Sequence, residues 1–269
     1  MPWEQDVSFM KSGKKSPLTG KPLRNPGQSL DESIDKILNE EALNYILASI
    51  FLIVFAAMEW FRWYRNLPYS PWVYSIMALL VTIFSIFKLI KIKKKLVRLK
   101  LGRDGERAVG QYLELLRENG CKIFHDMVGE NFNIDHVIIS THGIFIVETK
   151  TYSKPIRQQA TIKYDGRSIT IDGYQPKQDI LMQARAEANW LKSMLKESSG
   201  RDVQIKPVIV FPGWNVDNAS AGFNPDVWVL NPKALSKFIP KSQMSLSKED
   251  VALFAFNISR YIRSTYSIE

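Results

Sequence analysis

Two hydrophobic patterns divide the chain. Residues 42–58 carry no charged side chain, and neither do residues 66–87. Because an α-helix rises about 1.5 Å per residue, the second run can cross the roughly 30 Å hydrocarbon core of a bilayer. Aromatic residues that favour the membrane interface lengthen the first run: Trp60, Phe61, Trp63 and Tyr64. The pattern predicts a transmembrane helical hairpin through residues 42–64 and 66–87, with a buried hairpin of a soluble protein as the alternative.

From residue 102 the pattern becomes that of a soluble α/β domain. Amphipathic helices are predicted over residues 104–119, 175–198 and 248–266. Short apolar segments predict strands over residues 122–127, 134–140, 143–150, 161–166, 168–173, 203–211 and 226–231. The chain therefore combines a helical hairpin with a domain built on a sheet.

Composition places the boundaries between these parts. Residues 1–28 are rich in Gly, Pro, Ser and Lys, and a flexible basic leader is expected there. Ser29 and Glu32 have the spacing of a capping box, so a helix is expected to begin with Ser29 as its N-cap. Residues 29–100 are assigned to the hairpin and a basic juxtamembrane helix. The α/β domain is assigned to residues 101–241, and a C-terminal amphipathic helix to residues 242–269.

The charge distribution predicts the orientation of the hairpin. Of the net charge of +9, residues 1–100 contribute +7, from 15 Lys+Arg and 8 Asp+Glu, and residues 101–269 contribute only +2. Basic residues flank the hairpin on both sides, and positive flanks stay in the cytoplasm. Both termini and the α/β domain are therefore expected on the cytoplasmic side of an inner or plasma membrane. The basic run 88–103 is expected to anchor at the membrane surface, with DNA contact as the alternative.

Charged residues interrupt the most strand-like part of the chain, NIDHVIISTHGIFIVETK, residues 133–150. If Ser140 pairs with Gly143 across the turn, Asp135 falls opposite Glu148, with Cβ atoms about 5 Å apart. Two carboxylates that face each other in an apolar hairpin repel and lose hydration. A positive group between them relieves this. Lys150 is one candidate, and a divalent metal, which prefers carboxylate oxygens, is the better one.

Glu106 extends this acidic set. It shares one helical stripe with Val109, Leu113 and Leu116, where an acid is unusual. It either favours the dipole at the start of the helix or joins the acids of the hairpin. Lys150 projects toward the same place, where a lysine can orient or deprotonate a water and stabilise a pentavalent phosphate.

Three segments resemble the nuclease-related domain (NERD), a branch of the PD-(D/E)XK nuclease superfamily. They are GRDGERAV (102–109), NIDHVIIS (133–140) and GIFIVETK (143–150), and the resemblance extends over roughly residues 102–212. It implies an α/β fold with a PD-(D/E)XK-like central mixed sheet flanked by helices. It also implies cleavage of phosphodiester bonds in nucleic acid, with DNA favoured over RNA.

The resemblance also implies roles for individual residues. Asp135 and Glu148 would bind Mg²⁺ or Mn²⁺ together with the backbone carbonyl of Thr149. Glu106 would complete the set through a water ligand, and Lys150 would assist the attacking water.

Other positions match the family less closely. Gln183 matches a glutamine common in the family that contacts the site or the substrate, and a solvated helix residue is the alternative. Ile134 stands where the superfamily has Pro, and Lys154–Pro155 stand where the family often has Gly, at the substrate-side loop.

The leading interpretation is a membrane-anchored, cytoplasm-facing, metal-dependent nuclease. The alternative is a non-catalytic membrane-tethered module that binds nucleic acid or a protein, which the near-neutral α/β domain favours. The apolar and aromatic hairpin permits a homo-oligomer or a protein partner. The spacing of His125, His136 and His142 does not fit a zinc site, and the single Cys121 is expected to be a core residue.

Overall fold

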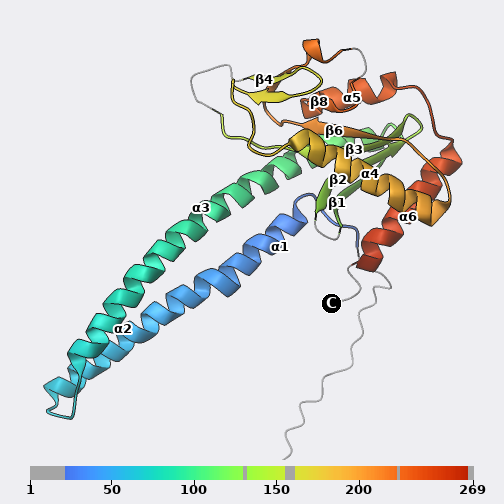
Figure 1. Cartoon of the computed structure of the whole chain (residues 1–269). Coiled ribbons are helices and arrows are strands. Elements are labelled where there is room, and N and C mark those ends of the chain that lie inside the picture. Colours follow the sequence, from blue (N-terminus) through green and yellow to red (C-terminus); the bar gives the residue numbers. More distant parts are fainter. Residues whose placement is uncertain (1–21, 130–131, 155–160, 223–224, 266–269) are drawn as a thin grey trace, which may run out of the picture.

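The computed structural model describes residues 22–129, 132–154, 161–222 and 225–265. A long helical hairpin projects from an α/β domain (Figure 1). Of the leader predicted for residues 1–28, residues 1–21 lie outside the described residues. Its last residues, 22–27, run along the domain and enter the first helix.

The domain is built on a mixed five-stranded sheet in the order β1-β2-β3-β6-β8. The strands β1 (Lys122–Val128), β2 (Asn133–Ser140) and β3 (Gly143–Thr149) are antiparallel. The strands β6 (Ile205–Val210) and β8 (Trp228–Leu230) run parallel to β3. A smaller sheet has the order β5-β4-β7, formed by β4 (Thr161–Tyr164), β5 (Ile169–Ile171) and β7 (Asn215–Asp217). Of these strands, β7 alone was not predicted, because it is short, polar and largely exposed.

Helices cover both faces of the larger sheet. On one face, α4 (Ile180–Ser199) and α6 (Lys248–Thr265) pack against β1–β3 through Leu191, Leu195, Phe254 and Ile258. On the other face, α3 (Pro71–Arg117) and α5 (Leu235–Phe238) enclose a second core. Three short 3₁₀ helices complete the connections: η2 (Ala219–Ala221), η3 (Pro232–Ala234) and η4 (Ile239–Lys241). Because α6 supplies part of the main core, it is integral to the domain.

The register of the acidic hairpin is the predicted one. Ser140 pairs with Gly143, and the same register continues to His136 opposite Val147. Extended by one residue, it places Asp135 opposite Glu148. Cys121 is buried in the second core, as predicted.

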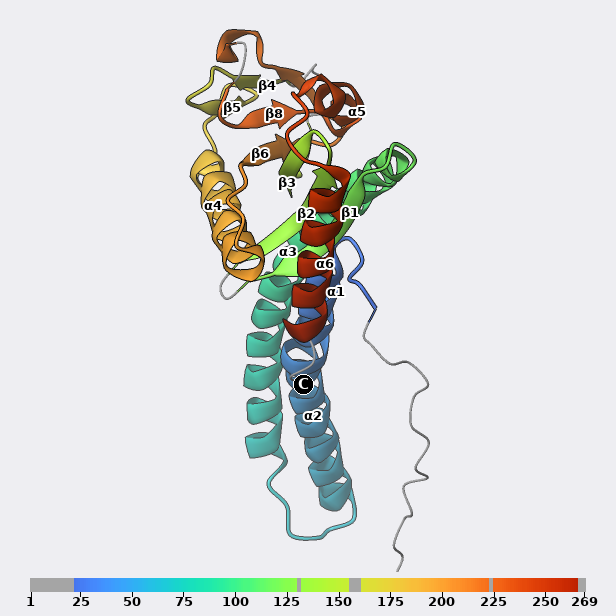
Figure 2. The ribbon, with the colours of Figure 1, turned by 90° about the vertical axis from the view of Figure 1, so that its right-hand side faces the viewer.

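The hairpin consists of two long helical arms that lie side by side in both views (Figures 1 and 2). The first arm joins α1 (Gln28–Lys36), a π-helical turn η1 (Ile37–Ala42) and α2 (Leu43–Tyr64), and the second is α3. Both arms are long and apolar enough to cross a membrane, judged by length and composition. Only 11% of the residues in each apolar window are buried, whereas the core helix of a soluble protein is mostly buried.

The second arm differs from the sequence prediction at two points. The uncharged run begins at residue 66, but α3 begins at Pro71, because Asn66 has a φ of 55° and proline favours the first helical position. The apolar run from Pro71, the basic run and the helix predicted over 104–119 form one continuous helix of 47 residues. The boundary assigned between residues 100 and 101 therefore falls inside α3, and no linker separates the hairpin from the domain.

The capping predicted for the first helix is wrong. Gly27, with a φ of 71°, is the N-cap of α1, and Ser29 lies within the first turn. The N–H and the hydroxyl of Ser29 donate to Asp126 on β1 at 2.9 and 2.5 Å. A carboxylate from a distant strand thus supplies the acceptor at the helix N-terminus, where negative charge is favourable.

Candidate active site

The predicted site residues meet beyond the carboxyl end of β3. Glu148 and Thr149 end this strand, and Lys150 follows it directly. Asp135 lies on the neighbouring strand β2, Glu106 comes from α3, and Gln183 comes from the first turns of α4. Because α3 and α4 cover opposite faces of the sheet, the site lies where the two helical layers approach the end of one strand.

Lys150 and Gln183 hold Glu148 from two sides. The ammonium of Lys150 donates to Oε1 of Glu148 at 2.7 Å and to Oε1 of Gln183 at 2.9 Å. The amide of Gln183 donates to Oε1 of Glu148 at 2.9 Å and to Oε1 of Glu187, one turn along α4, at 2.8 Å. Gln183 therefore belongs to the site and is not a solvated helix residue.

The sequence interpretation missed Glu187. Its side chain is buried beside Gln183 and shares the same hydrogen-bonded network. The signal was present, because Glu187 follows Gln183 by four residues and so lies on the same face of the helix. An acid on the buried face of an amphipathic helix is the same anomaly that drew attention to Glu106.

Asp135 is fixed by the backbone of the adjacent strand. Its Oδ2 accepts a hydrogen bond of 2.7 Å from the N–H of Thr149. Thr149 is supported in turn from the other face, where its hydroxyl lies 3.4 Å from Nε2 of His136. His136 is a packed, hydrogen-bonded residue, because its Nδ1 also lies 2.9 Å from Nδ1 of His125.

Gly105 lets α3 approach the site. A Cβ atom at this position would lie 1.8 Å from the hydroxyl oxygen and 3.0 Å from the Cβ of Thr151, which follows Lys150. No side chain larger than hydrogen fits this contact without displacing the Thr151 loop. The close approach places the next residue, Glu106, beside the acids of the hairpin, where it is buried.

Burial and mutual repulsion favour the protonated forms of Glu106 and Asp135. The pKa of Glu106 is raised to about 8 by burial and by repulsion from Asp126 and Glu148, against the opposing influence of the Gly27 N–H and of Lys150. The pKa of Asp135 is raised well above its usual range, first by burial and then by Glu148 and Glu106.

Burial and the charge of Glu148 also shift the pKa values of Glu187 and Lys150. The shift favours the neutral form of Glu187 and the charged form of Lys150. Burial, followed by repulsion from Glu148, raises the pKa of Glu187 to about 8. Burial alone would lower the pKa of Lys150, but the attraction of Glu148 and the hydrogen bond to it outweigh this, so the pKa is raised. Lys150 therefore carries its positive charge, and one cation faces four buried acids.

The donor atoms fit a hard divalent cation. In this cluster, three buried carboxylate oxygens have no hydrogen-bond partner: Oε2 of Glu106, of Glu148 and of Glu187. Within the described ranges, no group of three or more His, Cys, Asp or Glu side chains is placed so that it could hold a metal ion. A magnesium ion fits this arrangement, because it is usually bound by one or two carboxylates and keeps several waters.

A large cavity lies away from these residues. It has a volume of about 1030 Å³ and is lined by the first residues of β3, β6 and β8, among them Ile144, Ile205 and Trp228. These are the amino ends of the parallel strands, whereas Glu148 and Lys150 lie at the carboxyl end of β3. The candidate site is therefore not part of this cavity.

Comparison with known proteins gives one similarity, which covers the middle of the chain. No match was found among curated proteins or solved structures. The family model of the nuclease-related domain matches residues 101–212. This range includes all of the predicted site residues and Glu187, and it excludes most of the hairpin and the helix α6. Residues 101–212 are thus similar to the nuclease-related domain, and this matched segment holds the whole acidic cluster.

Proposed function

We propose that the protein is a membrane-anchored, metal-dependent nuclease of the PD-(D/E)XK type that cleaves phosphodiester bonds of DNA. One observation carries the proposal. Buried carboxylate oxygens without partners surround a charged lysine within a nuclease-related domain. A buried carboxylate without a partner is costly, so a cluster of them is best explained by a cation that binds there.

The residues present would hold the metal as follows. Asp135 and Glu148 would provide carboxylate oxygens, Thr149 its backbone carbonyl, and Glu106 a contact through water. When bound, Mg²⁺ or Mn²⁺ polarises the phosphate and lowers the pKa of a coordinated water. The N–H of Thr149 keeps the Asp135 carboxylate in one orientation.

Lys150 and Gln183 would act on the substrate side. The raised pKa of Lys150 keeps it protonated, which suits stabilisation of the negative charge that develops on the phosphate better than it suits removal of a proton from water. Gln183 contacts both Lys150 and Glu148 and so fixes the distance between cation and acid. Glu187 fixes the amide of Gln183 in turn.

The hairpin would anchor this domain to an inner or plasma membrane, with both termini on the cytoplasmic side. Its exposed apolar surface and its basic flanks support this assignment. Since α3 is continuous from the apolar run to Glu106, the site would stand at a fixed height above the bilayer.

A non-catalytic module is the second candidate. Residues 101–269 contain 21 basic and 19 acidic residues, a net charge of only +2. This near-neutral surface predicts weak nonspecific affinity for DNA. In addition, Lys150 is already engaged by Glu148 and Gln183 in this structure.

The deciding experiment compares cleavage and metal binding in the full chain, reconstituted in lipid nanodiscs. Plasmid, linear and single-stranded DNA, with RNA as a further substrate, are incubated with and without Mn²⁺. The proposal expects metal-dependent cleavage together with calorimetric binding of Mn²⁺ that Glu148→Gln abolishes. Binding that is unchanged in Glu148→Gln, with no cleavage by the wild type, supports the non-catalytic module.

A further inference from the structure

The segment before α1 crosses the turn of α3 that carries Glu106. We define residues 24–29 as the strap. At its centre, Pro26 packs so closely on α3 that a Cβ atom at Gly110 would lie 2.5 Å from its Cγ. Next to it, a Cβ atom at Gly27 would lie 3.0 Å from Cγ and 3.3 Å from the carbonyl oxygen of Arg103. Arg103 and Gly110 lie on either side of Glu106 along the helix, so the strap passes over the position of Glu106.

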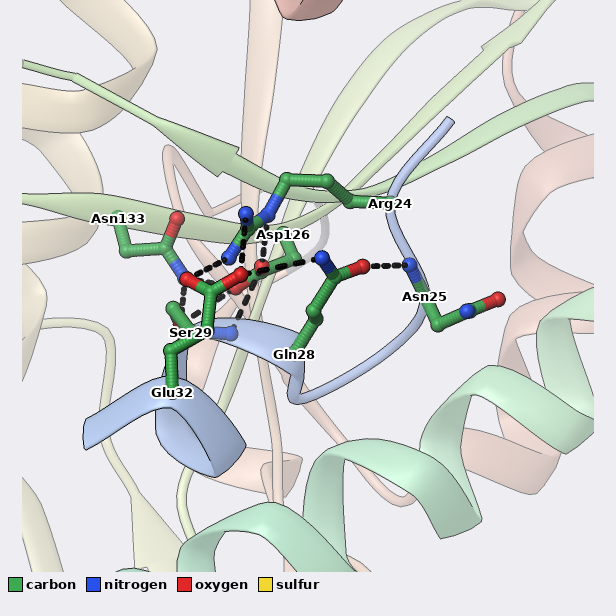
Figure 3. Close-up of polar contacts among 7 residues, drawn as sticks. All are labelled: Arg24, Asn25, Gln28, Ser29, Glu32, Asp126 and Asn133. Carbon is green, nitrogen blue, oxygen red and sulfur yellow. Dashed lines mark hydrogen bonds and ion pairs between the residues drawn. The ribbon is translucent and has the colours of Figure 1, made fainter. Parts of the chain in front are cut away.

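A buried ion pair holds the strap in place (Figure 3). Nε of Arg24 donates to Oδ2 of Asp126, and both side chains are almost completely buried, with exposures of 4% and 0%. The two terminal nitrogens of Arg24 form a bidentate pair with Glu32 at 2.9 and 2.8 Å. Arg24 thus joins a strand of the domain to the first helix of the hairpin.

Asp126 is saturated by groups from three elements. Besides Arg24, it accepts bonds from the N–H and hydroxyl of Ser29 on α1 and, at 2.6 Å, from the amide of Asn133 on β2. Figure 3 shows these side chains converging on its carboxylate. Asp126 itself has a φ of 53°, a left-handed conformation within β1 that Asp adopts more readily than most residues. The surrounding bonds determine this conformation.

The first arm of the hairpin is therefore attached to the domain independently of α3. Asp31 on α1 also pairs with Arg103 at 3.2 Å and with Arg107, which lie one turn apart and flank Glu106 on α3. Both arms thus meet at the turn that carries Glu106, one through the peptide chain and the other through the strap and these ion pairs.

We propose that the strap is a positioning element of the active site: the Arg24–Asp126 pair fixes Pro26 and Gly27 against α3, and this contact sets the position of Glu106 relative to Asp135 and Glu148. The inference rests on the proposed function for its effect on rate. The strap precedes the segment matched by the nuclease-related domain, so the hairpin supplies a part that the domain lacks.

The test displaces the strap without altering the acids or Arg24. In Gly110→Ala, the added Cβ meets Cγ and Cβ of Pro26 at 2.5 and 3.1 Å, while alanine favours the helix itself over glycine. Gly102→Ala is the matched control on the same helix, because its added Cβ meets only Cδ1 of Leu30, at 3.4 Å. Both variants and the wild type are prepared as the full chain in nanodiscs. Cleavage of DNA is measured with Mn²⁺, and hydrogen–deuterium exchange is measured at residues 26–29 and 103–110.

Gly110→Ala is expected to raise exchange in both segments and to lower kcat by about tenfold to a hundredfold, because misplacement by about 1 Å can cost about a hundredfold. KM for DNA and the melting temperature stay close to those of the wild type, and Gly102→Ala keeps the wild-type kcat. Raised exchange at residues 26–29 with unchanged kcat in Gly110→Ala overturns the inference. A wild type that does not cleave overturns the proposed function instead. Exchange then decides on the strap, since unchanged exchange at residues 103–110 in Gly110→Ala contradicts the contact.

Discussion

The ammonium of Lys150 lies 2.7 Å from Oε1 of Glu148, two residues earlier in the chain, and Gln183 contacts both. An acid and a lysine two residues apart share one side of an extended strand. The contact with α4 fixes how far apart they stay. This triangle explains why a charged lysine is stable at a site that is largely closed to water.

The first prediction concerns this triangle. Lys150→Met should lower cleavage by about a hundredfold or more, because it removes a preorganised positive charge from the developing phosphate charge. Gln183→Leu should have a smaller effect, since the lysine is still present but its ammonium is no longer held by the amide. Gln178→Leu, at an exposed position just before α4, is the control. Equal kcat in Gln183→Leu and in the control would show that the amide has no positioning role.

The second prediction concerns the pH dependence of stability. The pKa of Glu187 is raised to about 8 in the folded protein, from an ordinary value of 4.5. The folded state therefore binds this proton more tightly than the unfolded state, and stability falls as pH rises from about 4.5 to about 8. Glu187→Gln removes this loss, which is a few kcal/mol at about 1.4 kcal/mol per pH unit of pKa difference.

Thermal melts of the metal-free protein at pH 5 and pH 8.5 provide the measurement. Glu187→Gln should raise the melting temperature at pH 8.5 and change it little at pH 5. The control is Glu197→Gln, an exposed position on the same helix, which should have no effect at either pH. A stabilisation by Glu187→Gln that is equal at both pH values would contradict the assigned titration.

The third prediction concerns the isolated domain. A fragment of residues 101–269 lacks Arg24 and Ser29, so the fully buried Asp126 loses its cation. Removal of one partner from a buried ion pair costs about 3–5 kcal/mol. Asp126→Asn should therefore stabilise the fragment but destabilise the full chain, where it leaves Arg24 buried without this partner. Denaturant unfolding gives the free energy of unfolding of Asp126→Asn and of its parent, in the fragment and in the full chain. A change in the same direction in both would refute the account of the strap.

The fourth prediction concerns membrane orientation. Cys121 is buried, so it should react little with a thiol reagent and should not obscure the labelling of introduced cysteines. Tyr69 in the hairpin turn is 51% exposed, and Tyr174 in the domain is 76% exposed. In intact cells, a membrane-impermeant maleimide should label Tyr69→Cys but not Tyr174→Cys, and in inverted membrane vesicles the pattern should reverse. Labelling of Tyr174→Cys in intact cells would place the domain outside the cytoplasm.

Much of the fold and of the candidate site could be predicted from the sequence, because helices, strands and tight turns depend on residues that are close together in the chain. Strand periodicity and one assumed turn gave the register that places Asp135 opposite Glu148. A stripe of apolar residues marked Glu106 as buried. The uninterrupted α3 was missed, because a change of composition at residue 100 looks like a boundary although nothing there breaks the helix.

The strap could not be predicted in this way. Arg24 and Asp126 are 102 residues apart in the sequence, and no local periodic pattern marks either residue. Ser29 illustrates the same limit. Its local spacing favours an N-cap, but a carboxylate brought by the tertiary fold takes over that role. Contacts of this kind depend on how the hairpin docks, which no local pattern encodes.

The central claim is that the acids at the end of β3 bind a metal used to cleave DNA. The most direct measurement is Mn²⁺-dependent cleavage by the full chain in nanodiscs, compared among the wild type, Asp135→Asn and Glu148→Gln. Both substitutions keep the shape of the side chain and relieve repulsion between buried acids, so the melting temperature should not fall. The account predicts cleavage by the wild type and a loss of at least about a thousandfold in each folded variant. Full cleavage by Asp135→Asn would contradict it.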